Sequence, residues 1–265
     1  MKTLLGLSKD ELKQEMEAIG EKPFRAKQIW HWLYHQGETD FHKMTTLAKP
    51  LQDKLAGLYT LARPTVVTEK TSTDTTRKWL VRFADGKEVE TVYIPEEDRG
   101  AVCISTQIGC AQGCAFCHTG TQRLQRNLTA EEIVGQFMIA RDSYHEWPSP
   151  TDETRMLSNI VVMGMGEPLY NYDNLIKAVK ILSDGDGIAI SKRRITISTA
   201  GMADNIPRLA KDVGTKLAVS LHAPNDELRS RIMPINRKSP LRQLIDACKA
   251  YKQALEQRQY STMEY

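Results

Sequence analysis

Three cysteines stand close together in the segment Cys110-Ala-Gln-Gly-Cys114-Ala-Phe-Cys117, at spacings of four and three residues. Glycines at positions 109 and 113 allow the backbone around them to fold tightly. Three thiolates at these spacings suit an iron–sulfur cubane that is held through three of its four irons. The fourth iron is then open to a small ligand.

Two other interpretations of these cysteines stay open on the residues alone. A zinc site could use His118 as its fourth ligand, and a secreted protein could pair its cysteines in disulfides. Structural zinc sites usually combine two separated short-spaced pairs, and the sequence shows no second pair downstream. The five cysteines, an odd number, favour thiolate chemistry in a reducing compartment. We therefore favour a cluster and expect a cytoplasmic protein.

Length and charge set broad limits on the function. A chain of 265 residues has room for one large α/β domain and a small one. No apolar run approaches the ~18–20 residues needed to cross a membrane, and the first residues lack the anatomy of a signal peptide. The formal net charge of +3 permits a nucleic-acid partner without demonstrating one.

The elements that must position these cysteines begin near residue 102, where apolar runs alternate with amphipathic helices. This alternation is typical of right-handed βα units with a parallel sheet, in which active residues lie at the strand ends. The predicted strands are residues 102–108, 159–165, 194–199, 217–222 and a last one that starts near Ser261. The predicted inward positions of the helices are Ile133, Phe137 and Ala140, then Leu175, Ala178, Val179 and Leu182, then Leu241, Leu244, Ile245, Cys248 and Tyr251.

Polar residues follow three of these strands. The turn at residues 164–168 is rich in glycine and carries Glu167, which can accept a charge-assisted hydrogen bond from an amino-acid ammonium. Ser198 and Ser220 can bind a carboxylate or a ribose, and His222 follows the next strand. Each of these residues is also common as an ordinary turn or hydrogen-bonding residue. What indicates a shared binding site is that all of them lie at strand ends.

The N-terminal part predicts a small helical module. A capping box at residues 8–11 opens the first helix, and further helices are predicted at 23–34 and 47–58. Its basic and aromatic residues either contact RNA or cover a packed helical cap, and the pattern alone does not decide. These residues are Arg25, Lys27, His31, Trp32, Tyr34 and His35.

A β-hairpin is predicted from residues 78–83 and 88–94 around the turn Asp85-Gly86. Alternation puts Glu90 on the same face as Val92 and Ile94. If this face is buried, the pKa of the Glu90 carboxyl rises and suits proton transfer. If the other face is buried, Glu90 is simply solvated.

Longer motifs make the chain similar to a known family. They lie at residues 90–95, 163–169, 192–201, 217–226 and 233–236, with Cys103 seven residues before Cys110. Together with residues 23–26 and 30–34, they resemble the radical S-adenosylmethionine (SAM) enzymes that methylate adenosine in RNA, the RlmN/Cfr family. The resemblance covers essentially the whole chain.

This resemblance implies an α/β fold built as a partial, incomplete TIM-type radical SAM barrel, with a small N-terminal helical accessory domain and a β-hairpin. The expected division is an RNA-binding accessory domain at residues 1–75, a hairpin linker at 76–100 and a C-terminally incomplete radical SAM core at 101–265.

The resemblance also implies methylation of adenosine C2 in 23S rRNA, at the peptidyl-transferase centre, and in tRNA beside the anticodon. In the family, one SAM methylates a protein cysteine. A second SAM, bound at the [4Fe-4S] cluster, gives a deoxyadenosyl radical that activates this methyl group. Another cysteine helps to resolve the protein–RNA adduct, which leaves a disulfide.

Residue roles carry over by motif. Cys110, Cys114 and Cys117 match the cluster ligands, Cys103 the resolving cysteine and Glu90 the proton acceptor, which favours the buried interpretation of Glu90. The implied partners are 23S rRNA, tRNA and an electron donor such as flavodoxin, and the protein is expected to be a monomer without membrane contact. The SAM-binding positions are Gly166, Glu167, Ser198, Ser220, Leu221 and His222.

The sequence departs from the family pattern at Tyr265, inside the predicted fifth strand. Five parallel strands do not close a barrel, so the last is expected to be an edge. The family's methyl-carrying cysteine lies further on, and Cys248, on the apolar stripe of its helix, is predicted to be core. Our hypothesis is a truncated member that holds a cluster and SAM without completing methyl transfer. The alternatives are a Cfr-type enzyme that methylates C8 and a catalytically incomplete RNA-binding fragment.

Overall fold

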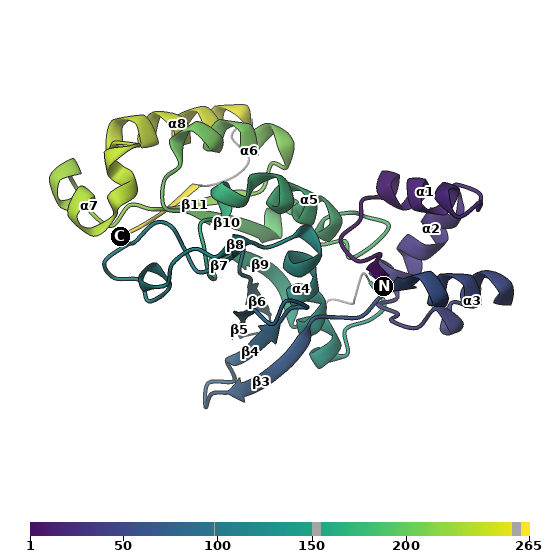
Figure 1. The fold of residues 1–265 in the computed structure, drawn as a ribbon. Helices are drawn as coiled ribbons and strands as arrows, with labels where there is room; N and C mark the ends of the chain where they lie inside the picture. Colours follow the sequence, from purple (N-terminus) through teal and green to yellow (C-terminus); the bar gives the residue numbers. More distant parts are fainter. Residues whose placement is uncertain (98, 150–154, 256–260) are drawn as a thin grey trace.

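The N-terminal part of the chain is a small helical module at one end of the molecule (Figure 1). The structure is a computed structural model that describes residues 1–97, 99–149, 155–255 and 261–265. The predicted capping box is confirmed, because Ser8 Oγ accepts from the Glu11 amide and the Glu11 carboxylate accepts from the Ser8 amide. The module consists of β1 (Lys2–Thr3), α1 (Lys9–Ala18), α2 (Arg25–Trp30), the π-helix η1 (His31–His35), the 3-10 helix η2 (Phe41–Lys43), α3 (Lys49–Leu58) and β2 (Tyr59–Thr60).

One of the aromatic residues considered for RNA contact belongs to the core of this module. Tyr34 is completely buried, and its hydroxyl accepts a hydrogen bond of 2.8 Å from the Gly6 amide. Trp32 is partly buried and donates to Thr46 Oγ1, whereas Lys27 and His31 are exposed. Any nucleic-acid contact of the module therefore uses its exposed basic residues rather than Tyr34.

An eight-stranded sheet forms the centre of the protein, in the order β12-β11-β10-β9-β6-β5-β4-β3. The strands from β12 to β6 run parallel, as predicted, and the hairpin extends the same sheet with antiparallel strands. Within the described ranges the sheet is open, with β12 and β3 at its edges. The strands are β3 (Thr65–Thr71), β4 (Arg77–Arg82), β5 (Glu88–Pro95), β6 (Gly100–Cys103), β9 (Leu157–Val162), β10 (Ile195–Thr199), β11 (Lys216–Ser220) and β12 (Ser261–Glu264).

The prediction of one continuous strand over residues 102–108 is wrong. β6 ends at Cys103, and β7 (Gln107–Ile108) pairs with β8 (Arg126–Asn127) outside the main sheet. The break is explained by Gln136, whose side-chain amide accepts from the Ser105 amide at 2.8 Å and donates to the Ser105 carbonyl at 3.0 Å. These backbone groups are thereby withdrawn from strand pairing.

Strand β3 is not predicted by the sequence pattern. All of its residues are exposed, so it lacks the alternation of buried and exposed side chains that marks a strand. It pairs with β4, so residues 65–71 extend the main sheet although they fall within the range 1–75 expected for the accessory domain.

The helices after residue 102 agree with the predicted pattern at most positions. Thr129 caps α4 in a capping box, as expected. On α8 the buried stripe includes Leu244, Cys248 and Tyr251 as predicted, but Ile245 is 40% exposed because it lies one position off this stripe. The sequence pattern does not predict α6 and α7, which have seven residues each. The helices are α4 (Ala130–Tyr144), α5 (Tyr172–Leu182), α6 (Ile206–Asp212), α7 (Asp226–Ile232) and α8 (Leu241–Ala254), with 3-10 turns η3 (Thr119–Thr121), η4 (Pro168–Asn171), η5 (Lys192–Arg194), η6 (Ala203–Asn205) and η7 (Pro234–Arg237).

Helices α4, α5, α6 and α8 lie on one side of the parallel strands (Figure 1). Strand residues that face this side, such as Val102, Ile160 and Ile197, are completely buried. None of the helices described above combines the length and apolarity needed to span a lipid bilayer.

The buried interpretation of Glu90 is wrong. On β5 the buried residues are Val89, Thr91 and Tyr93, while the Glu90 side chain is 50% exposed. Its carboxylate forms an ion pair of 2.8 Å with Lys78 on β4. Glu90 therefore lies on the face of the sheet opposite to the helices.

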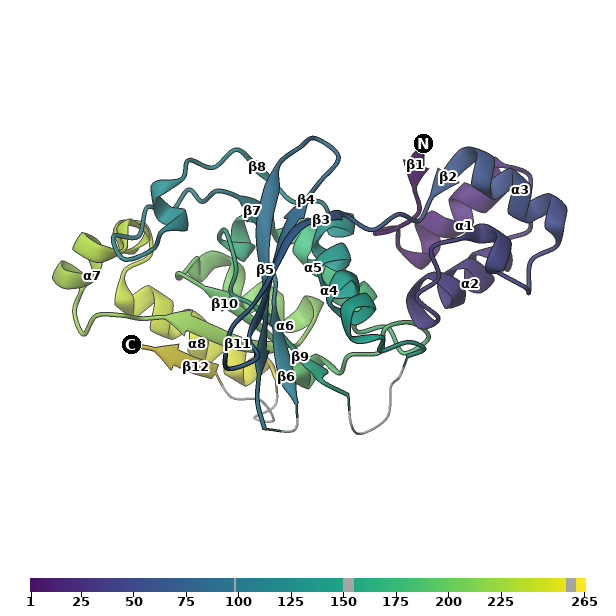
Figure 2. The same cartoon turned by 90° about the horizontal axis from the view of Figure 1, so that it is seen from below.

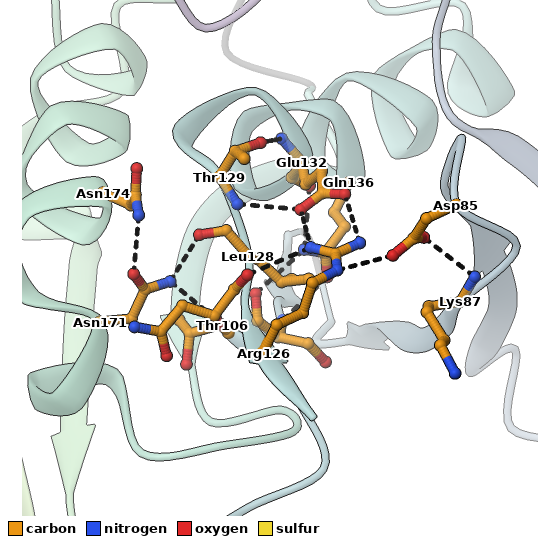
Figure 3. A network of polar contacts seen from close by, with 12 residues as sticks. Asp85, Lys87, Thr106, Arg126, Leu128, Thr129, Glu132, Gln136, Asn171 and Asn174 are labelled. Carbon is orange, nitrogen blue, oxygen red and sulfur yellow. Dashed lines mark hydrogen bonds and ion pairs between the residues drawn. The ribbon is translucent and has the colours of Figure 1, made fainter. Parts of the chain in front are cut away.

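Arg126 fixes the segment that returns from the cysteine loop (Figure 3). Its guanidinium binds both oxygens of Glu132 at 2.7 and 2.8 Å, and its Nε lies 2.7 Å from the carboxylate of Asp85 in the hairpin turn. From the other side, the amide of Asn171 donates to the carbonyls of Thr106 and Leu128. The hairpin, the first turn of α4 and β8 are thus tied together around the base of the loop.

Candidate functional site

The segments that follow β9, β10 and β11 line one cavity of about 250 Å³. Parallel strands bring these segments to the same edge of the sheet, as expected. Glu90, Cys103 and Leu221 are not among the residues that line the cavity. The predicted residues that do line it are Cys110, Cys114, Cys117, Gly166, Glu167, Ser198, Ser220 and His222.

The cysteine loop is shaped by a glycine and by backbone hydrogen bonds. Gly109 has φ +74°, and a Cβ at this position would lie 2.2 Å from the carbonyl oxygen of Arg123, so only glycine fits. The Cys117 amide donates to the Cys114 carbonyl at 3.1 Å. The loop therefore turns back on itself and directs its three cysteines into the same cavity.

The thiols of this loop are in surroundings that disfavour free thiolates. Burial, together with the nearby Cys110 and Cys117, raises the pKa of Cys114 to about 11. Burial also raises the pKa of Cys110. Thiolates in such a position need a bound cation to stabilise them, which iron provides in a cluster.

The cavity also contains a polar group that lacks a partner. Gln112 is 6% exposed, and its Nε2 makes no hydrogen bond in the described part of the chain. Leaving such a donor unsatisfied costs about 1–3 kcal/mol, so its position favours a bound group that accepts a hydrogen bond, such as a sulfide or a carboxylate. The loop residues therefore fit a [4Fe-4S] cluster.

The zinc interpretation finds no support in the placement of the side chains. Among the described residues, no three His, Cys, Asp or Glu side chains are grouped as ligands of a single metal ion. Cysteines that hold a cubane bind different irons and do not have to converge on one point.

Glu167 is a buried carboxylate held by neutral donors. It is 3% exposed and accepts from Thr199 Oγ1 at 2.8 Å, the Ala200 amide at 2.7 Å and the Leu169 amide at 3.0 Å. Burial raises its pKa. An ammonium group in the cavity would supply the positive charge that these donors do not.

Several residues that line or support the cavity are missed by the sequence analysis. Gln107 Oε1 accepts from the Glu167 amide at 2.8 Å and fixes the turn before it, and no sequence pattern marks this role. Glu264 accepts from Ser220 Oγ at 3.1 Å and lines the cavity from β12. Phe116 packs against His222 with ring centroids 4.7 Å apart. Phe116 lies between the second and third cysteines of the motif, and this position is a signal that could have identified it.

Cys103 lies beside the cavity on the open face of the sheet. In β6 it is paired with Val92 on one side and Val161 on the other. Burial raises the pKa of Cys103 to about 11, and a hydrogen bond from the backbone of Met163, which lines the cavity, works against this rise. Cys103 and Glu90 thus share one face of the sheet without contacting each other in the structure.

Comparisons with known families agree with this geometry. A family model described as "Ribosomal RNA large subunit methyltransferase N-terminal domain" matches residues 2–61, and one for the "Radical SAM superfamily" matches residues 104–263, more than half of the chain. A protein of Acidiphilium cryptum named "Dual-specificity RNA methyltransferase RlmN" is 58% identical over 265 residues, covering 99% of this chain and 68% of the relative. The chain belongs to the RlmN family of radical SAM proteins.

Other members of the RlmN family are still more similar in sequence. The RlmN proteins of Rhodospirillum rubrum and Gluconobacter oxydans are 63% and 61% identical to this chain. Each alignment covers 99% of the chain, but only 61% and 65% of the relative. The chain therefore spans less than two thirds of the length of these two relatives.

A solved structure confirms the predicted fold class. A radical SAM methyltransferase from Sphaerobacter thermophilus superposes with a TM-score of 0.90 at 43% identity, covering 100% of this chain and 76% of the other. The radical SAM α/β fold predicted from the motifs is thus confirmed, with an open sheet in the described residues.

Proposed function

We propose that this chain forms the cluster-binding and SAM-binding part of a radical SAM RNA methyltransferase. The observation that carries the proposal is the single cavity shared by three cysteine thiols and the buried carboxylate of Glu167. The names of the RlmN relatives, which describe dual-specificity RNA methyltransferases, support the same reaction class.

In this proposal Cys110, Cys114 and Cys117 hold the [4Fe-4S] cluster. When bound, a cluster with one open iron supplies the electron for reductive cleavage of SAM. Glu167 accepts a hydrogen bond from the SAM ammonium, because it is a buried carboxylate that has no cationic partner among the described residues.

The strand ends orient the rest of the cofactor. Ser198 and Ser220 line the cavity with hydroxyl groups that can bind a carboxylate or a ribose. The backbone of Leu221 supports this edge, since its amide donates to the Glu264 carbonyl at 2.9 Å. His222 and Phe116 place two rings against each other at the wall of the cavity.

The proposed substrate is C2 of an adenosine in 23S rRNA and in tRNA. Cys103 is the proposed resolving cysteine, and Glu90 the proposed proton acceptor. Their support is their position on the open face of the sheet, which the described helices leave uncovered and where Lys78 orients the Glu90 carboxylate. Cys248 is not assigned as the methyl-carrying cysteine, because it is 5% exposed within α8 and does not line the cavity.

The N-terminal module is proposed to contact RNA, with the hairpin as a linker to the core. In both views the module and the cysteine loop with α7 lie at opposite ends of the molecule (Figures 1 and 2). An RNA that contacts the module and reaches the cavity must therefore extend along the protein. We further propose that the protein acts as a monomer in the cytoplasm with an electron donor such as flavodoxin.

The function can be tested with anaerobically reconstituted protein, reductant, SAM and unmodified 23S rRNA or tRNA. We expect deoxyadenosine from SAM, and if a methyl group is also transferred to the RNA, we expect nucleoside mass spectrometry to locate it at C2 of adenosine. A methyl group at C8 would instead support the Cfr-type alternative. Unmethylated RNA beside deoxyadenosine would contradict methyl transfer by this chain while supporting the SAM site, and the absence of both products would contradict the proposal.

A further inference from the structure

Arg229 is a completely buried cation on α7, beside the cavity. Its hydrogen bonds go to neutral oxygens. A buried charge without a carboxylate partner is costly, so its retention needs a physical reason. The acceptors are the carbonyls of Leu221 (from Nε, 3.0 Å), Ala200 (from Nη2, 2.6 Å) and Ser220 (from Nη2, 2.9 Å), and the side-chain oxygen of Asn236 (from Nη1, 2.8 Å).

Asp226, on the same helix, interacts with this charge electrostatically, but within the described residues the two side chains form no direct ion pair. Asp226 Oδ1 accepts instead from the Leu241 amide at 2.8 Å and from the Asn236 side chain at 2.9 Å. The positive charge of Arg229 is therefore available to act on other groups near it.

Arg229 connects the two strand ends that form one wall of the cavity. Ala200 follows β10, whereas Ser220 ends β11 and Leu221 follows it. Gly201 gives the guanidinium room, because a Cβ at this position would lie 3.1 Å from Arg229 Nη2 and the backbone there has φ +116°. One side chain thus fixes the spacing between the segments that carry Ser198 and Ser220.

The helix that carries Arg229 also contacts the cysteine loop. The Ala115 amide, between two of the cysteines, donates to the carbonyl of Ile232 at 2.9 Å. At the end of this helix, the Met233 amide donates a hydrogen bond of 2.7 Å to the Arg229 carbonyl.

We propose that Arg229 is a positioning residue of the cofactor site, which holds the ends of β10 and β11 together and places a fixed positive charge on the helix that contacts the cysteine loop. This proposal rests on the proposed function, since it concerns the cluster and SAM. A cation near the cluster stabilises its reduced, more negative form, and the charge and hydrogen bonds around a cluster set its reduction potential. The hydrogen bonds to the strand ends set the geometry of the SAM-binding hydroxyls.

The test compares Arg229→Met, Arg229→Lys and Arg231→Met, all reconstituted with the cluster. Arg231 is the control because it is exposed on the same helix. Two quantities are measured: the midpoint potential of the cluster by a redox titration followed by electron paramagnetic resonance (EPR), and the Kd of SAM.

The Met variant is expected to have a more negative potential and a SAM affinity about 10- to 100-fold lower, as for other groups that support metal ligands. The Lys variant keeps the charge, so its potential is expected to stay close to that of the parent. Its SAM affinity is expected to fall, because the lysine ammonium cannot reproduce the planar arrangement of N–H donors of the guanidinium. The Arg231→Met variant is expected to change neither quantity.

A lower melting temperature of the Met and Lys variants with unchanged potential and SAM affinity would overturn the proposal, because it would show a purely structural role. If the Met variant does not fold, the Lys variant decides: weaker SAM binding with an intact cluster supports the proposal, and parental affinity overturns it. A parent chain that takes up no SAM-responsive cluster would overturn the proposed function together with this proposal.

Discussion

Replacement of Cys114 by alanine is expected to abolish cluster binding, whereas replacement of Cys248 by alanine leaves it intact. Cys114 lines the cavity between its two neighbours in the motif, and a [4Fe-4S] cluster that leaves one iron for SAM has no protein ligand to spare. Cys248 is buried on α8, and its truncation removes only core packing, at a cost of about 1 kcal/mol.

The measurement is the iron and acid-labile sulfide content after anaerobic reconstitution, together with the visible absorption of the cluster. The Cys248→Ala variant controls for the loss of a thiol as such. A Cys114→Ala protein with a full complement of iron and sulfide would contradict the assignment of the ligands, and so would a Cys248→Ala protein without them.

The Glu167→Gln variant is expected to bind SAM roughly 100-fold more weakly, because loss of one partner of a buried charge pair costs about 3 kcal/mol. The substitution removes the negative charge that is proposed to face the SAM ammonium. It also turns one of the two acceptors for Thr199 Oγ1, Leu169 and Ala200 into a donor, so at least one of these groups loses its partner.

The affinity is measured by titration calorimetry on cluster-loaded protein. Glu131→Gln is the matched control, since Glu131 is another partly buried carboxyl whose pKa is raised by burial, but it does not line this cavity. Unchanged SAM affinity in the Glu167→Gln protein, with its cluster and fold intact, would contradict the proposed role of Glu167.

The sequence predicts the part of the cavity that depends on the spacing of residues within one motif or directly after one strand. The cysteine motif sets its own loop, and Glu167, Ser198, Ser220 and His222 follow parallel strands whose ends must meet. No knowledge of the packing is needed for these residues, because the alternation of strands and helices already brings them to one edge.

The orientation of Glu90 could not be predicted in this way. Its strand has apolar residues on both faces, so the alternation does not say which face is covered. The structure decides this through Val89 and Tyr93, which are buried among other core residues, and through Thr91, which donates to Gln136 on α4.

The residues that hold the site segments in place could not be predicted from the sequence pattern either. Arg229, Gln107 and Gln136 act through contacts with segments far away in the sequence, such as the hydrogen bond between Gln107 and the Glu167 amide. Their side chains are polar, so their burial contradicts the pattern expected for a core position. Only the folded chain shows which backbone groups they satisfy.

The central claim, that one cavity holds a cluster with an iron open to SAM, is tested most directly by EPR spectroscopy. The reduced cluster of the reconstituted protein is recorded with and without SAM, and SAM labelled with ¹⁷O in its carboxylate or ¹⁵N in its amino group reports contact with the iron. We predict that SAM changes the spectrum and that the labels couple to the cluster. A spectrum that is the same with and without SAM would contradict the account.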